Sequence, residues 1–136
     1  MKIYALLFLV LCLSQQLHAK EIDVYAFCDA STKFLKKLSV LPLEDLVAVK
    51  SAIAASSSLE ELSVASGVPY IDWIEDTQKQ LLVSESDAKL IVFEQVKPIE
   101  FSRYSRVINM HGVKDHRLWD KVLNDCVSVN LAALID

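Results

Sequence analysis

The sequence predicts an all-α protein, a single small helical domain of about five to seven helices that follows a cleaved signal peptide. Apolar residues recur three and four positions apart along most of the chain, which is the spacing of one helix face. The 136 residues include 2 glycines, too few for the tight turns of a sheet. A hydrophobic fraction of 53% excludes intrinsic disorder. A loop-rich α+β arrangement is the alternative.

Residues 1–19 have the pattern of a secretory signal peptide, and residues 20–136 form the expected helical domain. Lys2 gives a positive start, residues 3–13 form an uncharged apolar run, and Ala19 is the small residue before the expected cut. An uncleaved anchor is the alternative, but the run is well short of the ~20 residues that cross a bilayer as a helix. We therefore expect an exported protein, periplasmic or secreted, with no stable membrane insertion after cleavage.

Two cysteines, Cys28 and Cys126, remain after removal of the signal peptide. Each lies within an apolar stripe of helical spacing, so both thiols are expected to face the core, one on the first helix and one on the last. The stripes are Val24, Phe27, Cys28, Ser31, Leu35 and Leu38, and then Leu118, Val122, Cys126, Val129 and Ala133. An even number of cysteines in an oxidising compartment predicts one disulfide, with two free buried thiols as the alternative.

The first two helices are expected to meet near Pro42. The first stripe predicts a helix over residues 23–39, and Pro42 suits the first turn of the next helix because its missing N–H has no partner there. The expected buried face of the second helix comprises Leu43, Leu46, Val49 and Ile53. The serines at 56–58 then interrupt the helical pattern.

A capping box marks the start of a short helix over residues 59–66. Ser58 is the expected N-cap with Glu61 reaching back, and Gly67 is placed where a left-handed residue ends a helix. Pro69 is expected to open the next helix. The apolar face of that helix comprises Tyr70, Trp73 or Ile74, and Leu81.

The second half of the chain contains one ambiguous segment. The apolar run within residues 88–96 fits either a short strand or a buried helix, and a helix is favoured because no other strand is available for pairing. Pro98 is expected to start a further helix that ends near Gly112. Its inward residues are Phe101, Tyr104, Val107 and Ile108, and a last helix is expected over residues 115–134.

Nucleic acid is not an expected partner. Residues 58–82 resemble a helix-turn-helix, but the second helix carries Asp72, Glu75 and Asp76 where a DNA reader needs basic or amide side chains. The net charge is −4, and it becomes −5 when Lys2 leaves with the signal peptide. A simple helical hairpin accounts for this segment better.

The chain offers little for catalysis, and we expect neither an enzyme nor a metal or other cofactor. His111, Asp115 and His116 are the cluster of metal-ligand type, but Gly112 interrupts the helix between them and Asp115 is better suited to a helix start. The paired carboxylates fall at helix starts or exposed faces, and no Gly-x-Ser-x-Gly motif is present. These pairs are Glu44 with Asp45, Glu60 with Glu61, Glu75 with Asp76, and Glu85 with Asp87.

Aromatic and arginine side chains are the candidate binding residues, because these types dominate the energetics of protein interfaces. The candidates are Tyr70, Trp73, Arg103, Arg106 and Trp119. A weaker lead is the basic face of the first helix, which suits either an anionic membrane surface or plain solvation. That face carries Lys33, Lys36 and Lys37.

These features favour a small exported helical protein that binds another protein, such as an inhibitor, an immunity factor or an adaptor. An acidic surface would speed its encounter with a basic partner. The alternative is a carrier of a small apolar ligand in a cavity between helices, suggested by the apolar run at residues 90–93. An exported hydrolase ranks third, and it requires His111 to lie buried beside an acid.

Overall fold

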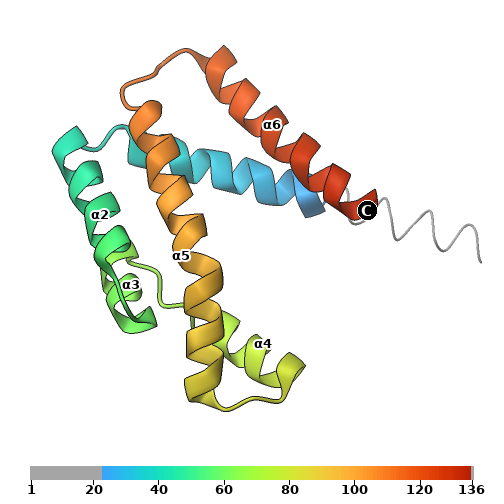
Figure 1. Ribbon diagram of the computed structural model, residues 1–136. Helices are drawn as coiled ribbons and strands as arrows, with labels where there is room; N and C mark the ends of the chain where they lie inside the picture. Colours follow the sequence, from blue (N-terminus) through green and yellow to red (C-terminus); the bar gives the residue numbers. More distant parts are fainter. Residues whose placement is uncertain (1–22, 136) are drawn as a thin grey trace, which may run out of the picture. The chain divides into compact units, whose positions relative to one another are not determined.

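The computed structural model describes residues 23–135, and these are all-α as predicted (Figure 1). The described residues contain no strand, so the α+β alternative is wrong. The helices comprise residues 23–39, α2 (Leu43–Ala55), α3 (Leu59–Ser66), α4 (Ile71–Leu81), α5 (Glu85–Asn109) and α6 (His116–Ile135). The predicted signal peptide at residues 1–19 lies outside the described residues.

The chain divides into two compact units. The disulfide unit comprises the described residues 23–36 and 113–135, and its buried side chains include Cys28, Leu35 and Trp119. The bundle unit comprises residues 37–112 and contains α2, α3, α4 and α5. One boundary between the units falls at residues 36 and 37, within the last turn of the helix over residues 23–39.

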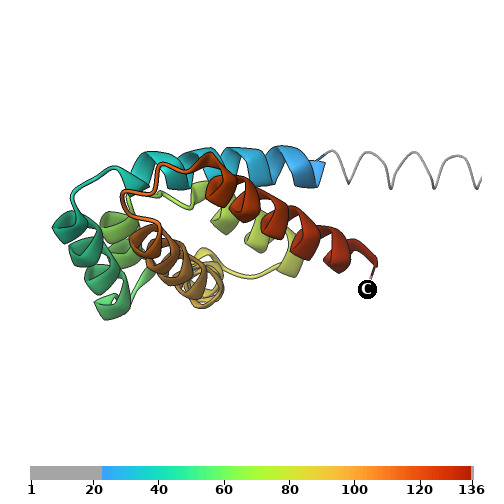
Figure 2. The ribbon, with the colours of Figure 1, turned by 90° about the horizontal axis from the view of Figure 1, so that it is seen from above.

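The disulfide unit pairs the helix over residues 23–39 with α6 in antiparallel orientation (Figure 2). A disulfide joins Cys28 to Cys126 with 5.8 Å between the Cα atoms, which confirms the predicted pairing. Near the other end of the pair, the Lys36 ammonium lies 5.9 Å from the centre of the Trp119 ring. The two helices are thus held together both covalently and by a cation–aromatic contact.

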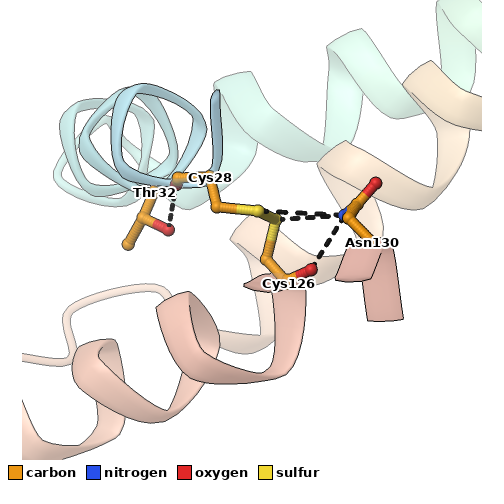
Figure 3. Close-up of a disulfide and its surroundings, with 4 residues drawn as sticks. All are labelled: Cys28, Thr32, Cys126 and Asn130. Atoms are coloured by element: carbon orange, nitrogen blue, oxygen red, sulfur yellow. Dashed lines mark hydrogen bonds between the residues drawn. A yellow bond between two sulfur atoms is a disulfide. The ribbon is translucent and has the colours of Figure 1, made fainter. Parts of the chain in front are cut away.

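Two polar side chains, Thr32 and Asn130, lie beside the disulfide cysteines (Figure 3). The Thr32 hydroxyl donates a hydrogen bond of 2.8 Å to the carbonyl of Cys28. The Asn130 amide donates one of 2.8 Å to the carbonyl of Cys126, and its nitrogen lies 3.8 Å and 3.6 Å from the two sulfur atoms. Each bond pairs a side chain with the carbonyl four residues earlier, so the polar groups beside the disulfide are satisfied within their own helices.

The predicted apolar stripes of the disulfide unit are wrong at four positions. The exposed residues, which the helical spacing assigned to the core, are Phe27, Leu118, Val129 and Ala133. Apolar residues occupy more than one face of these helices, so spacing alone does not select the buried face. The burial of Cys28 and Leu35 marks the face that the fold uses.

α5 provides the central stripe of the bundle unit, and α2, α3 and α4 all pack against it. The stripe repeats every three or four residues and comprises Ala88, Val92, Val96, Glu100, Tyr104 and Val107. Leu46 and Ile53 of α2 and Leu62 of α3 are fully buried in the same unit. The ambiguous segment at 88–96 is therefore a helix, as favoured.

The prediction that Pro98 begins a new helix is wrong, because α5 runs without a break through Pro98 to Asn109. A proline inside a helix removes one backbone hydrogen bond and costs roughly 3 kcal/mol. The buried stripe continues on both sides of Pro98, with Val96 before it and Glu100 and Tyr104 after it. Packing of this stripe compensates for the local cost.

Local capping chemistry was predicted well at α3. The Ser58 hydroxyl accepts a hydrogen bond of 3.2 Å from the backbone N–H of Glu61, and Gly67 ends the helix with φ of 74°. The Glu61 carboxylate reaches one residue further back than expected and accepts from the N–H of Ser57 at 2.8 Å. Ser84 caps α5 in the same way, a cap that Ser84 and Asp87 already encode in the sequence.

Non-glycine residues with left-handed backbone conformations bound α4 at both ends. Tyr70 precedes the helix with φ of 54°, and Leu82 follows it with φ of 53°. The expected apolar face of α4 is only partly realised: Tyr70 is buried and Ile74 is half-buried, whereas Trp73 and Leu81 are exposed. Residues that carry a side chain seldom adopt positive φ. The two ends of α4 therefore carry a cost in backbone conformational energy.

Candidate protein-binding surface

The N-terminus of α4 carries an aromatic pair. Tyr70 is 5% exposed, whereas Trp73, one turn later, is 47% exposed. Their ring centres lie 6.5 Å apart at an interplanar angle of 75°, an edge-to-face arrangement that aromatic pairs favour. The buried tyrosine thereby fixes the position of a tryptophan that has much of its surface free to contact a partner.

An ion pair on α5 lies beside the aromatic pair. Both carboxylate oxygens of Glu100 accept hydrogen bonds from one guanidinium nitrogen of Arg103, at 2.9 Å and 3.1 Å. Glu100 is 4% exposed, so its charge is nearly removed from water and is compensated by Arg103. The pair holds the guanidinium in place on the surface of α5.

These side chains line one open cleft of about 440 Å³. The cleft is lined by Val68, Pro69, Tyr70, Ile71, Asp72, Trp73, Glu100 and Arg103. Three of the five candidate binding residues, Tyr70, Trp73 and Arg103, therefore meet at one place. We call these eight residues the aromatic cleft.

The hydroxyl of Tyr70 lies within the structure rather than in solvent. It shares a hydrogen bond of 3.2 Å with the Ser66 hydroxyl. Burial raises the pKa of Tyr70 to about 12, and the nearby negative charge of Glu100 acts in the same direction. Tyr70 is therefore neutral at physiological pH and serves to support Trp73.

Stability is expected to fall at high pH because of Tyr70. Its pKa is higher in the folded protein than the value of 10.0 for an unperturbed tyrosine, so its contribution is complete below about pH 10 and is lost as the pH rises to 12. The expected loss is about 2–3 kcal/mol. Urea unfolding across this range measures it. Tyr70→Phe should abolish this part of the loss, whereas Tyr25→Phe, at an exposed position, should retain it. If the free energy of unfolding falls equally with pH in both variants, Tyr70 is not the cause of the loss.

The other two candidate residues do not line the aromatic cleft. Arg106 is exposed in the last turn of α5. Trp119 belongs to the disulfide unit and is 3% exposed, and its indole nitrogen donates a hydrogen bond of 2.9 Å to the carbonyl of Val113. Its buried ring has little area left for a partner and fixes the segment that leads into α6.

The outer face of α4 is acidic. Asp72, Glu75 and Asp76 are exposed on this short helix, and the described part of the structure gives them no ion pair. Asp72 also lines the aromatic cleft. Glu75 lines a second open cleft of about 540 Å³, which lies between α3, α4 and α5. In that second cleft Lys89 already pairs with Glu60 and Glu85, at 3.2 Å and 3.6 Å. The exposed surface of α4 thus carries three carboxylates together with the apolar side chains of Ile71 and Trp73.

In the cluster of His111, Asp115 and His116, Asp115 caps the start of α6. The Asp115 carboxylate accepts from the N–H of Arg117 at 3.0 Å, as expected for a residue at a helix start, and bonds to Arg117 lower the pKa of Asp115. The exposed His111 ring lies 3.0 Å from the carbonyl of Leu41. Among residues 23–135, no three histidine, cysteine, aspartate or glutamate side chains are grouped as metal ligands.

The basic face of the first helix is partly paired. Lys33 forms an ion pair of 2.8 Å with Asp29, which raises the pKa of Lys33, and Lys36 lies over Trp119. Within the described residues, no helix is both long enough and apolar enough to cross a membrane. Comparison of the chain with protein-family models, curated protein sequences and solved structures gives no match.

Proposed function

We propose that this protein is a small exported helical protein that binds another protein and does so without catalysis, as an inhibitor, immunity factor or adaptor does. The observation that carries the proposal is the aromatic cleft, where Tyr70, Trp73 and Arg103 meet. Tryptophan and arginine are among the residue types that contribute most binding energy at protein interfaces, and the buried Tyr70 supports Trp73. Their convergence supports a binding surface at the junction of α4 and α5.

The side chains of the aromatic cleft are already held in place. Tyr70 fixes Trp73 by an edge-to-face contact, and Glu100 fixes Arg103 by two hydrogen bonds. Ordering a flexible side chain on binding costs about 0.5–1.5 kcal/mol, and a pre-positioned side chain avoids much of this cost. The arrangement suits tight association with a partner of complementary shape.

The charge around α4 favours a basic partner. The exposed carboxylates of Asp72, Glu75 and Asp76 lie on the same short helix as the exposed apolar side chains of Ile71 and Trp73. Opposite charge on a partner would steer the encounter and speed association, with an effect that weakens as salt is added. We therefore propose that the partner presents lysine or arginine beside an apolar side chain.

Two observations support export. The predicted signal peptide at residues 1–19 is one, and the disulfide between Cys28 and Cys126 is the other. Disulfides form and persist in oxidising compartments such as the periplasm and the extracellular space. The proposed partner is thus a protein that the chain meets outside the cytoplasm.

Native mass spectrometry of the protein from the exported fraction of its source tests the proposal. We expect a complex with a second polypeptide, together with a mass that shows cleavage after Ala19 and an intact disulfide. Recovery of the protein with a small organic molecule and no polypeptide, under conditions that preserve complexes, would contradict the proposal and favour the carrier alternative.

A further inference from the structure

An apolar groove runs between α2 and α5, and the aromatic cleft shares no residue with it. Its lining comprises Ala54, Phe93, Glu94, Lys97, Pro98 and Phe101, and its volume is about 470 Å³. Phe93 and Phe101 are eight residues apart on α5, which corresponds to about 12 Å along the helix axis. This volume lies within the usual range of small-molecule sites.

Lysine ammonium groups lie over both phenylalanine rings of the groove. The Lys50 nitrogen is 4.9 Å from the centre of the Phe101 ring, and the Lys97 nitrogen is 5.5 Å from that of Phe93. Lys97 also donates a hydrogen bond of 2.7 Å to the carbonyl of Ser56. Lys50 is half-buried, and within the described part of the chain it forms no ion pair. The Lys50 ammonium thus lies at the Phe101 end of the apolar groove, and no ion pair within the described residues neutralises it.

We propose that this groove binds a single-chain amphiphile with a carboxylate head, such as a medium-chain fatty acid. The head would pair with the Lys50 ammonium, and the alkyl chain would lie along Phe101, Pro98 and Phe93. A charge-assisted bond to a half-buried ammonium is stronger than a bond between neutral groups. Glu94 lines the groove, so a second negative group on the ligand is disfavoured and a monoanion fits best.

Calorimetric titration of the protein with monomeric dodecanoate tests this site. We expect Lys50→Gln to weaken dodecanoate binding about tenfold, the loss of one bond to a charged group. Lys79→Gln, which removes an exposed positive charge on α4 outside the groove, is the matched control and should bind as the wild type does. Dodecanol, which lacks the charge, should bind about tenfold more weakly than dodecanoate and equally to wild type and Lys50→Gln.

A second variant keeps the test independent of changes at Lys50. Ala54→Glu places a carboxylate in the groove from an exposed position on α2, and it should lower dodecanoate affinity at least about tenfold. Equal affinity of Lys50→Gln and Lys79→Gln, or of dodecanol and dodecanoate, would overturn the site. Binding to anionic phospholipid vesicles without binding to monomeric dodecanoate would also overturn the site. A wild-type dimer that the Ala54→Glu substitution dissociates would overturn it as well, because the groove would then be an interface between two copies of the chain. None of these outcomes bears on the aromatic cleft.

Discussion

Replacing Cys28 and Cys126 together with serine is expected to lower the free energy of unfolding by about 4–5 kcal/mol. The bond joins residues 98 positions apart, and a cross-link closing a loop of this size removes a large amount of entropy from the unfolded chain. The midpoint of thermal unfolding should fall by about 20 °C. Urea and thermal unfolding of the wild type and the double variant measure the effect.

The loss should be concentrated in the disulfide unit. The bundle unit has its own fully buried residues, including Ile53, Leu62 and Val92, so its amide hydrogens should stay protected when the bond is removed. Hydrogen exchange should show reduced protection across residues 113–135 and little change across residues 88–107. Asn130→Ala, which disturbs the surroundings of the bond but retains it, is the control. Unchanged unfolding in the serine variant would show that the bond contributes no stability.

Removing Arg103 is expected to destabilise the protein by about 2–3 kcal/mol. Arg103→Ala leaves the carboxylate of Glu100 buried without its partner, and an unpaired buried charge is among the costliest defects in a protein. The value lies near the lower end of the usual range because the Arg103 side chain is partly exposed, so water replaces some of the lost interaction. Urea unfolding at neutral pH is the measurement.

A double variant separates the buried charge from general damage to α5. Glu100→Leu combined with Arg103→Ala removes both charges and places an apolar side chain on the stripe between Val96 and Tyr104. Its stability should return to within about 1 kcal/mol of the wild type, because replacing a buried ion pair by an apolar group is often neutral. If the double variant is as unstable as Arg103→Ala, the carboxylate is not the cause.

Features of the fold that depend on local chemistry could be predicted from the sequence. The Ser58 cap, the Gly67 helix end and the pairing of two cysteines each rest on a few residues. The path of α5 through Pro98 could not be predicted in this way, because packing along the whole helix outweighs a local penalty. The left-handed conformation of Tyr70 is likewise imposed by its surroundings, since tyrosine has no preference for it.

The sequence indicates which residue types contribute to the aromatic cleft, but it does not show that these residues lie together. Tyr70, Trp73 and Arg103 are residue types common at protein interfaces, and the structure brings them together. Glu100 was missed because dividing α5 at Pro98 hides the stripe in which this carboxylate occupies a buried position. Its spacing of three residues from Arg103 was the available signal. The burial of Trp119 depends on the pairing of distant helices, which residue type does not reveal.

The affinity of the purified partner for Trp73→Ala tests the proposed binding surface most directly. Loss of an interface tryptophan is expected to weaken binding by at least about 30-fold, which corresponds to a loss of about 2 kcal/mol. Leu118→Ala is the matched control, because Leu118 is also 47% exposed but belongs to the disulfide unit. The account predicts weak binding by Trp73→Ala and wild-type binding by Leu118→Ala. Wild-type affinity of a folded Trp73→Ala variant would contradict it.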